Sequence, residues 1–245
     1  YEIAQDFEWD MTQKAVVVPI GNAGNISAVM NGFLKFFRAG IIDRLPKIIG
    51  VQSEHADPVY QYYLETDKSR RQFKPVNTKP SVAQAAMIGN PVSMPRVVAI
   101  AEEYNTASGQ DNVFFVQVTE QAIMDWQLTA NQNGHIACTQ GGECLAGLVR
   151  AKAMGLVALN ETAVLDATAH AIKFSEFQDL YFKNRIPEPY HIVPDPDRVN
   201  LPELISPEDP DLVPSQEKRL EESEFARFVQ EISKKIAQKM DLTPD

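Results

Sequence analysis

The amino-acid sequence predicts an α/β protein with an open, mostly parallel sheet and helices on both faces. Short apolar runs alternate with longer segments of helical period along most of the chain, as in β-α-β units. The run AVVVPI at residues 15–20 passes into a helix with no charged loop between them. At 245 residues the chain is also long enough to bury a substantial core.

The expected strands are rich in β-branched and aromatic residues and are bounded by turn residues. They lie at residues 15–20, 47–53, 112–118, 135–138 and 162–168. The expected helices carry apolar residues three or four positions apart. They span residues 26–39, 58–64, 81–88, 93–105, 120–131, 143–153 and 171–182.

The composition changes after about residue 185, and this change predicts the domain organisation. Residues 1–185 form the predicted α/β domain. Residues 186–214 are rich in proline and acidic side chains, which predicts an extended linker or arm. Residues 215–245 contain a predicted amphipathic helix, whose apolar face is formed by Leu220, Phe225, Phe228, Val229, Ile232 and Ile236.

Charge and cysteine content exclude several classes of protein. The net charge of −10 and the absence of a dense basic face argue against nucleic acid as a partner. Cys138 and Cys144 are six residues apart without a histidine at ligand spacing, so we expect no disulfide framework, no metal site and a cytoplasmic location. No apolar run reaches the ~18 residues of a membrane span. The opening YEIAQDFEWD lacks Met and resembles the middle of a helix, so a fragment is expected.

The segment GNAGN at residues 21–25 is the strongest candidate binding site. A strand that delivers two glycines to a helix N-terminus presents several backbone N–H groups and the positive end of the helix dipole. Glycine allows close approach of an anion, and asparagine tolerates a left-handed backbone. A plain βα turn needs only one glycine. We therefore interpret Gly21, Asn22, Ala23, Gly24 and Asn25 as a phosphate-binding loop.

Two nucleotide-binding motifs match this loop poorly. A P-loop ends in GK followed by Ser or Thr, which is absent here. A dinucleotide fingerprint needs three glycines, and the acidic residue that follows the second strand, Glu54, lies farther on than the usual ~20 residues. A nucleotide-binding domain of the Rossmann type stays open as a weaker alternative.

The segment TQGGECLAGL, which begins at Thr139, is a second strand–glycine–helix junction. A packed corner explains Cys138 and Cys144 as small buried side chains. Thr139 is a candidate ligand contact, because ligands bind at the carboxyl ends of strands in open α/β sheets. His170 is better explained as a capping or packing group than as a general base, and the other histidines indicate no function.

Five segments resemble the threonine synthases, a family of fold-type-II pyridoxal-phosphate enzymes related to the tryptophan synthase β subunit. They occur in the order of that family and span about residues 3–185. They are VVVPIGNAGNISAVMNGF, LPKIIGVQSEHADPV, SVAQAAMIGNPVSMPR, CTQGGECLAGLVRA and AVLDATAHAIKF. The IGNPVS stretch favours threonine synthase over threonine dehydratase and cysteine-synthase relatives.

The resemblance implies the conversion of O-phospho-L-homoserine and water to L-threonine and phosphate. It implies that residues 21–25 bind the phosphate of pyridoxal 5′-phosphate. The family also places a hydroxyl or thiol against the ring nitrogen of the cofactor. Gly141 occupies the usual position of that group here, so Thr139 is the preferred substitute and Cys138 the other.

The lysine that holds the cofactor as a Schiff base lies farther upstream in the family than this chain reaches. Lys14 is the only lysine before the loop, and its place at the edge of a strand predicts a solvated side chain. We therefore expect a C-terminal part that needs the N-terminal part of the same enzyme for activity, with a homodimer as a candidate assembly. A non-catalytic member of the fold, or another lyase such as threonine dehydratase, is the alternative.

Overall fold

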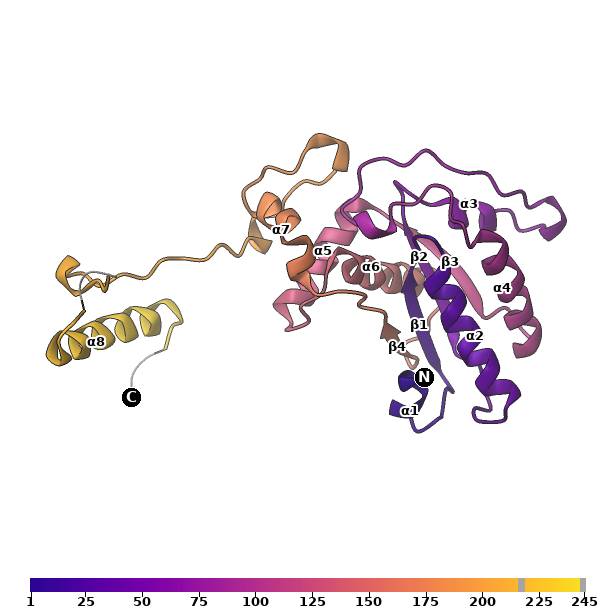
Figure 1. Cartoon of the computed structure of the whole chain (residues 1–245), viewed down its shortest axis with the longest axis horizontal. Helices are drawn as coiled ribbons and strands as arrows, with labels where there is room; N and C mark the ends of the chain where they lie inside the picture. Colours follow the sequence, from indigo (N-terminus) through magenta and orange to yellow (C-terminus); the bar gives the residue numbers. More distant parts are fainter. Residues whose placement is uncertain (216–218, 243–245) are drawn as a thin grey trace. The chain divides into compact units, whose positions relative to one another are not determined.

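The computed structural model describes residues 1–215 and 219–242. The chain forms two compact units, Tyr1–Val199 and Asn200–Asp245, which are described separately (Figure 1). No helix of the described residues is long and apolar enough to cross a lipid bilayer.

The first unit is built on a four-stranded sheet in which all neighbouring strands are parallel. The strand order is β3-β2-β1-β4. The strands are β1 (Lys14–Pro19), β2 (Lys47–Ser53), β3 (Val113–Val118) and β4 (Thr162–Leu165). In the centre of the sheet Val17 is in register with Ile49 of β2 and with Leu165 of β4.

Helices cover both faces of this sheet (Figure 1). They are α1 (Glu2–Asp6), α2 (Gly24–Arg38), α3 (Pro58–Leu64), α4 (Met94–Ser108), α5 (Glu120–Gln132), α6 (Thr139–Ala153) and α7 (Ser175–Phe182). Alternate residues of the strands point to opposite faces. Val16 and Ile48 therefore pack in one apolar core with α2 and α4, and Val17 and Ile49 pack in a second core with α5, α6 and α7.

The open parallel sheet with helices on both faces confirms the predicted fold class. The expected strand at residues 135–138 is wrong, because Ala137 forms only an isolated antiparallel bridge with His170. The start expected for the following helix is also wrong, since α6 begins at Thr139 and not at residue 143. Gly141 and Gly142 lie inside its first turns, where helix propensity disfavours them.

Residues 186–199 pack on the first unit, although their composition predicts an extended arm. The Val193 N–H donates to Gln121 Oε1 at 2.7 Å, and the Asp195 N–H donates to the Tyr181 hydroxyl at 2.8 Å. Ile192 is buried in the second core. The domain boundaries predicted at residues 185 and 214 stay a prediction.

The second unit contains α8 (Glu222–Lys239), which is amphipathic as predicted but begins later than residue 215. The part of the expected helix at residues 216–218 lies outside the described residues. Glu221 and Glu224 form a capping box at its start. Arg227 pairs with Asp209 at 3.2 Å, which ties the helix to the preceding segment.

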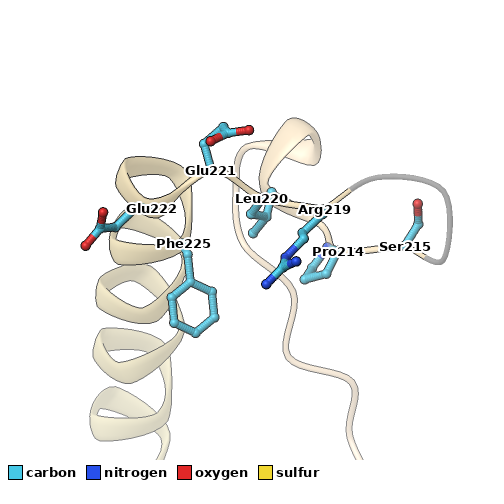
Figure 2. Close-up of a pocket in the computed structure, with 7 residues that line it drawn as sticks. All are labelled: Pro214, Ser215, Arg219, Leu220, Glu221, Glu222 and Phe225. Atoms are coloured by element: carbon cyan, nitrogen blue, oxygen red, sulfur yellow. The ribbon is translucent and has the colours of Figure 1, made fainter.

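A hollow of about 740 Å³ lies beside the start of α8. Figure 2 shows its lining residues, Pro214, Ser215, Arg219, Leu220, Glu221, Glu222 and Phe225. All of them except Leu220 are exposed, so the hollow is an open surface feature and no buried polar group lines it.

Candidate functional site

The loop between β1 and α2 lies at the carboxyl edge of the sheet. Pro19 ends β1 and Gly24 begins α2, so only residues 20–23 connect the two elements. The Ile20 N–H still donates to the Val51 carbonyl at 2.9 Å, and the Ser93 N–H donates to the Asn22 carbonyl at 3.2 Å. These bonds on both sides of the turn fix the path of the loop.

Ala23 adopts the left-handed backbone conformation in this loop, with φ +63°. Glycine and asparagine tolerate this region better than alanine, which has a Cβ but no side-chain hydrogen bond to offset its strain. Residue type therefore does not indicate that Ala23, between two residues better suited to it, adopts this conformation. The left-handed residue turns the chain abruptly into α2 and lets consecutive N–H groups face the same space.

The backbone N–H groups of residues 21–25 donate no hydrogen bond to any described residue. They meet the N-terminus of a helix of 15 residues, where the helix dipole adds positive potential. Backbone N–H groups are obligatory donors, and a run of unpaired donors at a helix start is suited to bind an anion.

The two glycines of the loop have different reasons to be glycine. A Cβ at Gly21 would lie 3.0 Å from the Ala85 carbonyl oxygen and 3.2 Å from Ala86 Cα. Close contact with residues 85–86 therefore disfavours a side chain there. A Cβ at Gly24 would meet nothing closer than Ser93 Oγ at 4.0 Å, so this position is open at the helix start.

A cavity of about 340 Å³ opens beside these N–H groups. It is lined by Pro19, Gly21, Asn22, Ala23, Gly24, Asn25, Ala85, Ala86, Gln140 and Thr168. The five residues predicted to bind phosphate therefore line one cavity. No lysine or arginine is among its lining residues in the described part of the chain, so backbone donors and the helix dipole are the source of positive potential.

Thr168 and Gln140 are lining residues that sequence reasoning missed. The signal for Thr168 was present, because it follows β4 by three residues and so lies at the same edge of the sheet as the loop. The expected strand at 162–168 hid this signal by placing Thr168 inside the strand. Gln140 was hidden because the helix was expected to begin only at residue 143.

Thr139 is wholly buried and does not line the cavity, and its Oγ1 has no hydrogen-bond partner among the described residues. Cys138 is also buried, with its Sγ 3.8 Å from Thr168 Oγ1. That Thr139 meets the cofactor ring stays a prediction. Thr168 is the hydroxyl that faces the cavity.

The remaining predicted polar groups lie outside the cavity or support its wall. Asn25 donates from its side-chain amide to the Asp166 carboxylate, which links the start of α2 to the end of β4. His170 accepts from the Ile172 N–H at 3.2 Å and acts as a cap. Lys14 lies in β1, where its Nζ donates to the Thr12 carbonyl at 3.2 Å.

An open parallel sheet with unpaired backbone N–H groups and a cavity at its carboxyl edge is typical of α/β proteins that bind a phosphorylated ligand. The family model described as "Pyridoxal-phosphate dependent enzyme" matches residues 1–166. The chain belongs to this family, whose members use pyridoxal phosphate, so the predicted cofactor and the predicted fold type are confirmed at the level of the family.

Several relatives are threonine synthases. Threonine synthase 2 of Arabidopsis thaliana, named chloroplastic, is 32% identical over 187 residues, which are 76% of this chain and 34% of the relative. Threonine synthase of Methanocaldococcus jannaschii is 32% identical over 174 residues, 71% of this chain and 40% of the relative. This chain therefore spans between a third and two fifths of these relatives.

A solved structure shares the fold. Threonine synthase from Escherichia coli superposes with a TM-score of 0.52 at 20% identity, covering 78% of this chain and 40% of the other. At this identity the similarity concerns the architecture alone.

Proposed function

We propose that this chain forms the cofactor-phosphate side of a threonine synthase, a pyridoxal-phosphate-dependent lyase that acts on a phosphate ester. The reaction converts O-phospho-L-homoserine and water to L-threonine and inorganic phosphate, the last step of threonine biosynthesis. Support comes from two threonine synthase relatives at 32% identity and from the IGNPVS stretch at residues 88–93.

The observation that carries the proposal is the row of unpaired N–H groups at residues 21–25 beside the cavity. Each charge-assisted hydrogen bond contributes roughly 1.5–3 kcal/mol, so three such bonds would contribute about 5–9 kcal/mol before ordering costs. This is enough to bind a phosphate without a cationic side chain. Pyridoxal phosphate carries such a group, and the cavity accepts it at the helix start.

When bound, pyridoxal phosphate supplies an electron sink for chemistry at the amino-acid carbon atoms. The residues of this chain bind and orient it. The N–H groups of the loop would hold the phosphate, and the Thr168 hydroxyl, which lines the same cavity, would be available to the cofactor ring. Thr139, proposed from the sequence, can take that role only if the buried start of α6 opens.

No lysine is among the described residues that line the cavity, which supports the inference that the lysine that attaches the cofactor comes from elsewhere in the enzyme. We therefore propose that turnover requires protein beyond these 245 residues. The proposal predicts that the chain by itself binds phosphorylated pyridoxine compounds and releases no threonine.

The test is an assay of the natural protein expressed from its complete gene, with pyridoxal phosphate and O-phospho-L-homoserine. Equal amounts of threonine and phosphate are expected. A protein that instead converts L-threonine to a 2-oxo acid would be a threonine dehydratase, which is the alternative reading. A cofactor-loaded protein active on neither substrate would move the function to another amino acid, and a protein that retains no cofactor would favour a non-catalytic member of the fold.

A further inference from the structure

One wall of the cavity is the segment Ser81–Ala86, called the wall segment below. Ala85 and Ala86 line the cavity and lie within contact distance of Gly21 in the phosphate loop. The wall segment contains only one short 3-10 turn and belongs to no α-helix or strand. Its position must therefore be fixed by contacts with other elements.

Glu120, the first residue of α5, holds the beginning of the wall segment. Its Oε2 accepts from the Val82 N–H at 2.7 Å, and its Oε1 accepts from the Ser53 hydroxyl. Glu120 is fully buried and Ser53 is 3% exposed. Hydrogen bonds to a buried carboxylate are strong, and the positive end of the helix dipole of α5 favours the negative charge.

His55 ties the residues before the wall segment to the same cluster. Its Nδ1 lies 2.6 Å from the Pro80 carbonyl oxygen, and because a carbonyl can only accept, Nδ1 carries the proton and donates. The backbone carbonyl of His55 accepts from the Lys79 N–H at 3.0 Å. Nδ1 also lies 3.8 Å from Glu120 Oε1, so the imidazole and the carboxylate form one buried group.

The end of the wall segment is held from α6. With its amide oxygen directed at the segment, Gln140 accepts from the Gln84 N–H at 3.3 Å and from the Ala85 N–H at 3.1 Å. Gln140 also lines the cavity. Two side chains therefore hold the wall segment by hydrogen bonds. The buried carboxylate of Glu120 binds its beginning, and the amide of Gln140 binds its end.

We propose that Glu120 is a positioning residue for the phosphate site: its buried carboxylate holds the wall segment against the phosphate loop and so keeps the cavity shaped for its ligand. This inference rests on the proposed function, because the ligand in question is the phosphate of a pyridoxine compound. Glu120 touches no ligand itself and acts through Val82, Ala85 and Ala86.

The test compares three variants of the 245-residue chain. Glu120→Leu keeps volume but removes the acceptor, and Glu120→Gln removes the charge but keeps one acceptor oxygen. Glu143→Leu is the matched control, since Glu143 is equally buried and lies near Glu120, but no hydrogen bond joins it to the wall segment among the described residues. The probe is pyridoxine 5′-phosphate, which lacks the aldehyde and so cannot react with lysines.

Two measurements are made on each variant. Amide hydrogen exchange of the ligand-free chain reports whether residues 82–86 stay ordered, and calorimetric titration reports the affinity for the probe. Removing the acceptor of a buried, charge-assisted hydrogen bond should raise exchange in the wall segment and weaken binding about tenfold or more in Glu120→Leu. Glu120→Gln should remain within about threefold of the wild type, and Glu143→Leu should change neither quantity.

Unchanged exchange at residues 82–86 in Glu120→Leu would overturn the positioning role, and so would a loosened segment with unchanged affinity. If Glu143→Leu changed exchange and affinity as much as Glu120→Leu does, general destabilisation would explain both variants, and the positioning role would be overturned too. If the wild type does not bind the probe, the proposed function fails, and the exchange data still decide whether Glu120 holds the segment. Should Glu120→Leu not fold, Ser53→Ala removes one donor to Glu120 and is expected to loosen the same segment.

Discussion

The two glycine-bearing junctions that lead into a helix, GNAGN between β1 and α2 and TQGG in the first turn of α6, look alike in sequence and differ in the structure. At the first junction the N–H groups of residues 21–25 are unpaired and face a cavity. At the second, Gly141 and Gly142 lie inside α6 and are buried. A Cβ at Gly142 would lie 2.5 Å from the Ile123 carbonyl oxygen, and one at Gly141 would lie 2.7 Å from Ala137 Cβ.

The difference shows that glycine can have two different roles at the start of a helix. At Gly24 the absence of a side chain leaves open space at the helix start, whereas at Gly142 it lets α6 pack against α5. The two roles make opposite predictions. A substitution in the open junction should affect binding and leave stability nearly unchanged, and a substitution in the packed junction should do the reverse.

The largest effect is expected for Gly24→Asp on the affinity for pyridoxine 5′-phosphate. The new carboxylate would lie beside the unpaired N–H groups and repel the phosphate, so a loss of about a hundredfold or more is expected. Calorimetric titration measures the affinity, and Gly24→Ala, which adds a methyl group without charge, is the control. Unchanged affinity in Gly24→Asp would remove the phosphate-loop assignment.

Gly142→Ala should lower the free energy of unfolding by about 2 kcal/mol, because its methyl group would overlap backbone atoms of α5. Urea denaturation measures the change. Gly32→Ala in α2 is the matched control, since no atom lies within 4 Å of the added Cβ. That control should gain about 0.5–1 kcal/mol from the helix propensity of alanine. Equal stability of the two variants would show that the junction before α6 is not tightly packed.

Thr168→Val and Thr139→Val separate the two candidate hydroxyls for the cofactor ring. Thr168 lines the cavity, so its replacement should weaken the binding of pyridoxine 5′-phosphate about tenfold. Thr139 Oγ1 is buried without a partner, so valine there should leave binding unchanged and stabilise the fold. The reverse pattern would support the assignment made from the sequence.

The smallest effect concerns Glu143 at the packed junction. Burial, followed by the nearby Glu120 carboxylate, raises the pKa of Glu143 well above its usual value. Between the unfolded and the folded pKa the folded protein binds more protons, so stability falls as pH rises through this range. Glu143→Gln should therefore lose less stability than the wild type as the pH rises above the ordinary titration range of a glutamate. The free energy of unfolding of both proteins is measured by urea denaturation at several pH values. An equal change with pH in the variant and the wild type would contradict this prediction.

The four strands of the sheet and the position of the loop after β1 could be predicted because their signals are local. Runs such as KIIGVQS have the β-branched composition of a strand that is buried on both faces, and the structure places β2 there. Two glycines at a helix start indicate a candidate anion site, and only a few neighbouring residues are needed to recognise this pattern. All five loop residues named from the sequence line the cavity.

The position of the wall segment and the contact of Cys138 with Thr168 could not be predicted, because residues distant in the sequence form these contacts. Val82 meets Glu120 across 38 residues of sequence, and Cys138 lies near Thr168 across 30. Neither pair has a sequence spacing that would indicate a contact. The start of α6 was missed for a related reason, since packing against α5 overrides the low helix propensity of Gly141 and Gly142.

The central claim, that residues 21–25 bind the phosphate of a pyridoxine compound, is tested most directly by titrating the wild-type chain with pyridoxine 5′-phosphate and with pyridoxine. The account predicts saturable binding of the phosphorylated compound at one site, competition by inorganic phosphate, and much weaker binding of pyridoxine. Equal affinity for the two compounds, or no binding of the phosphorylated one, would contradict it.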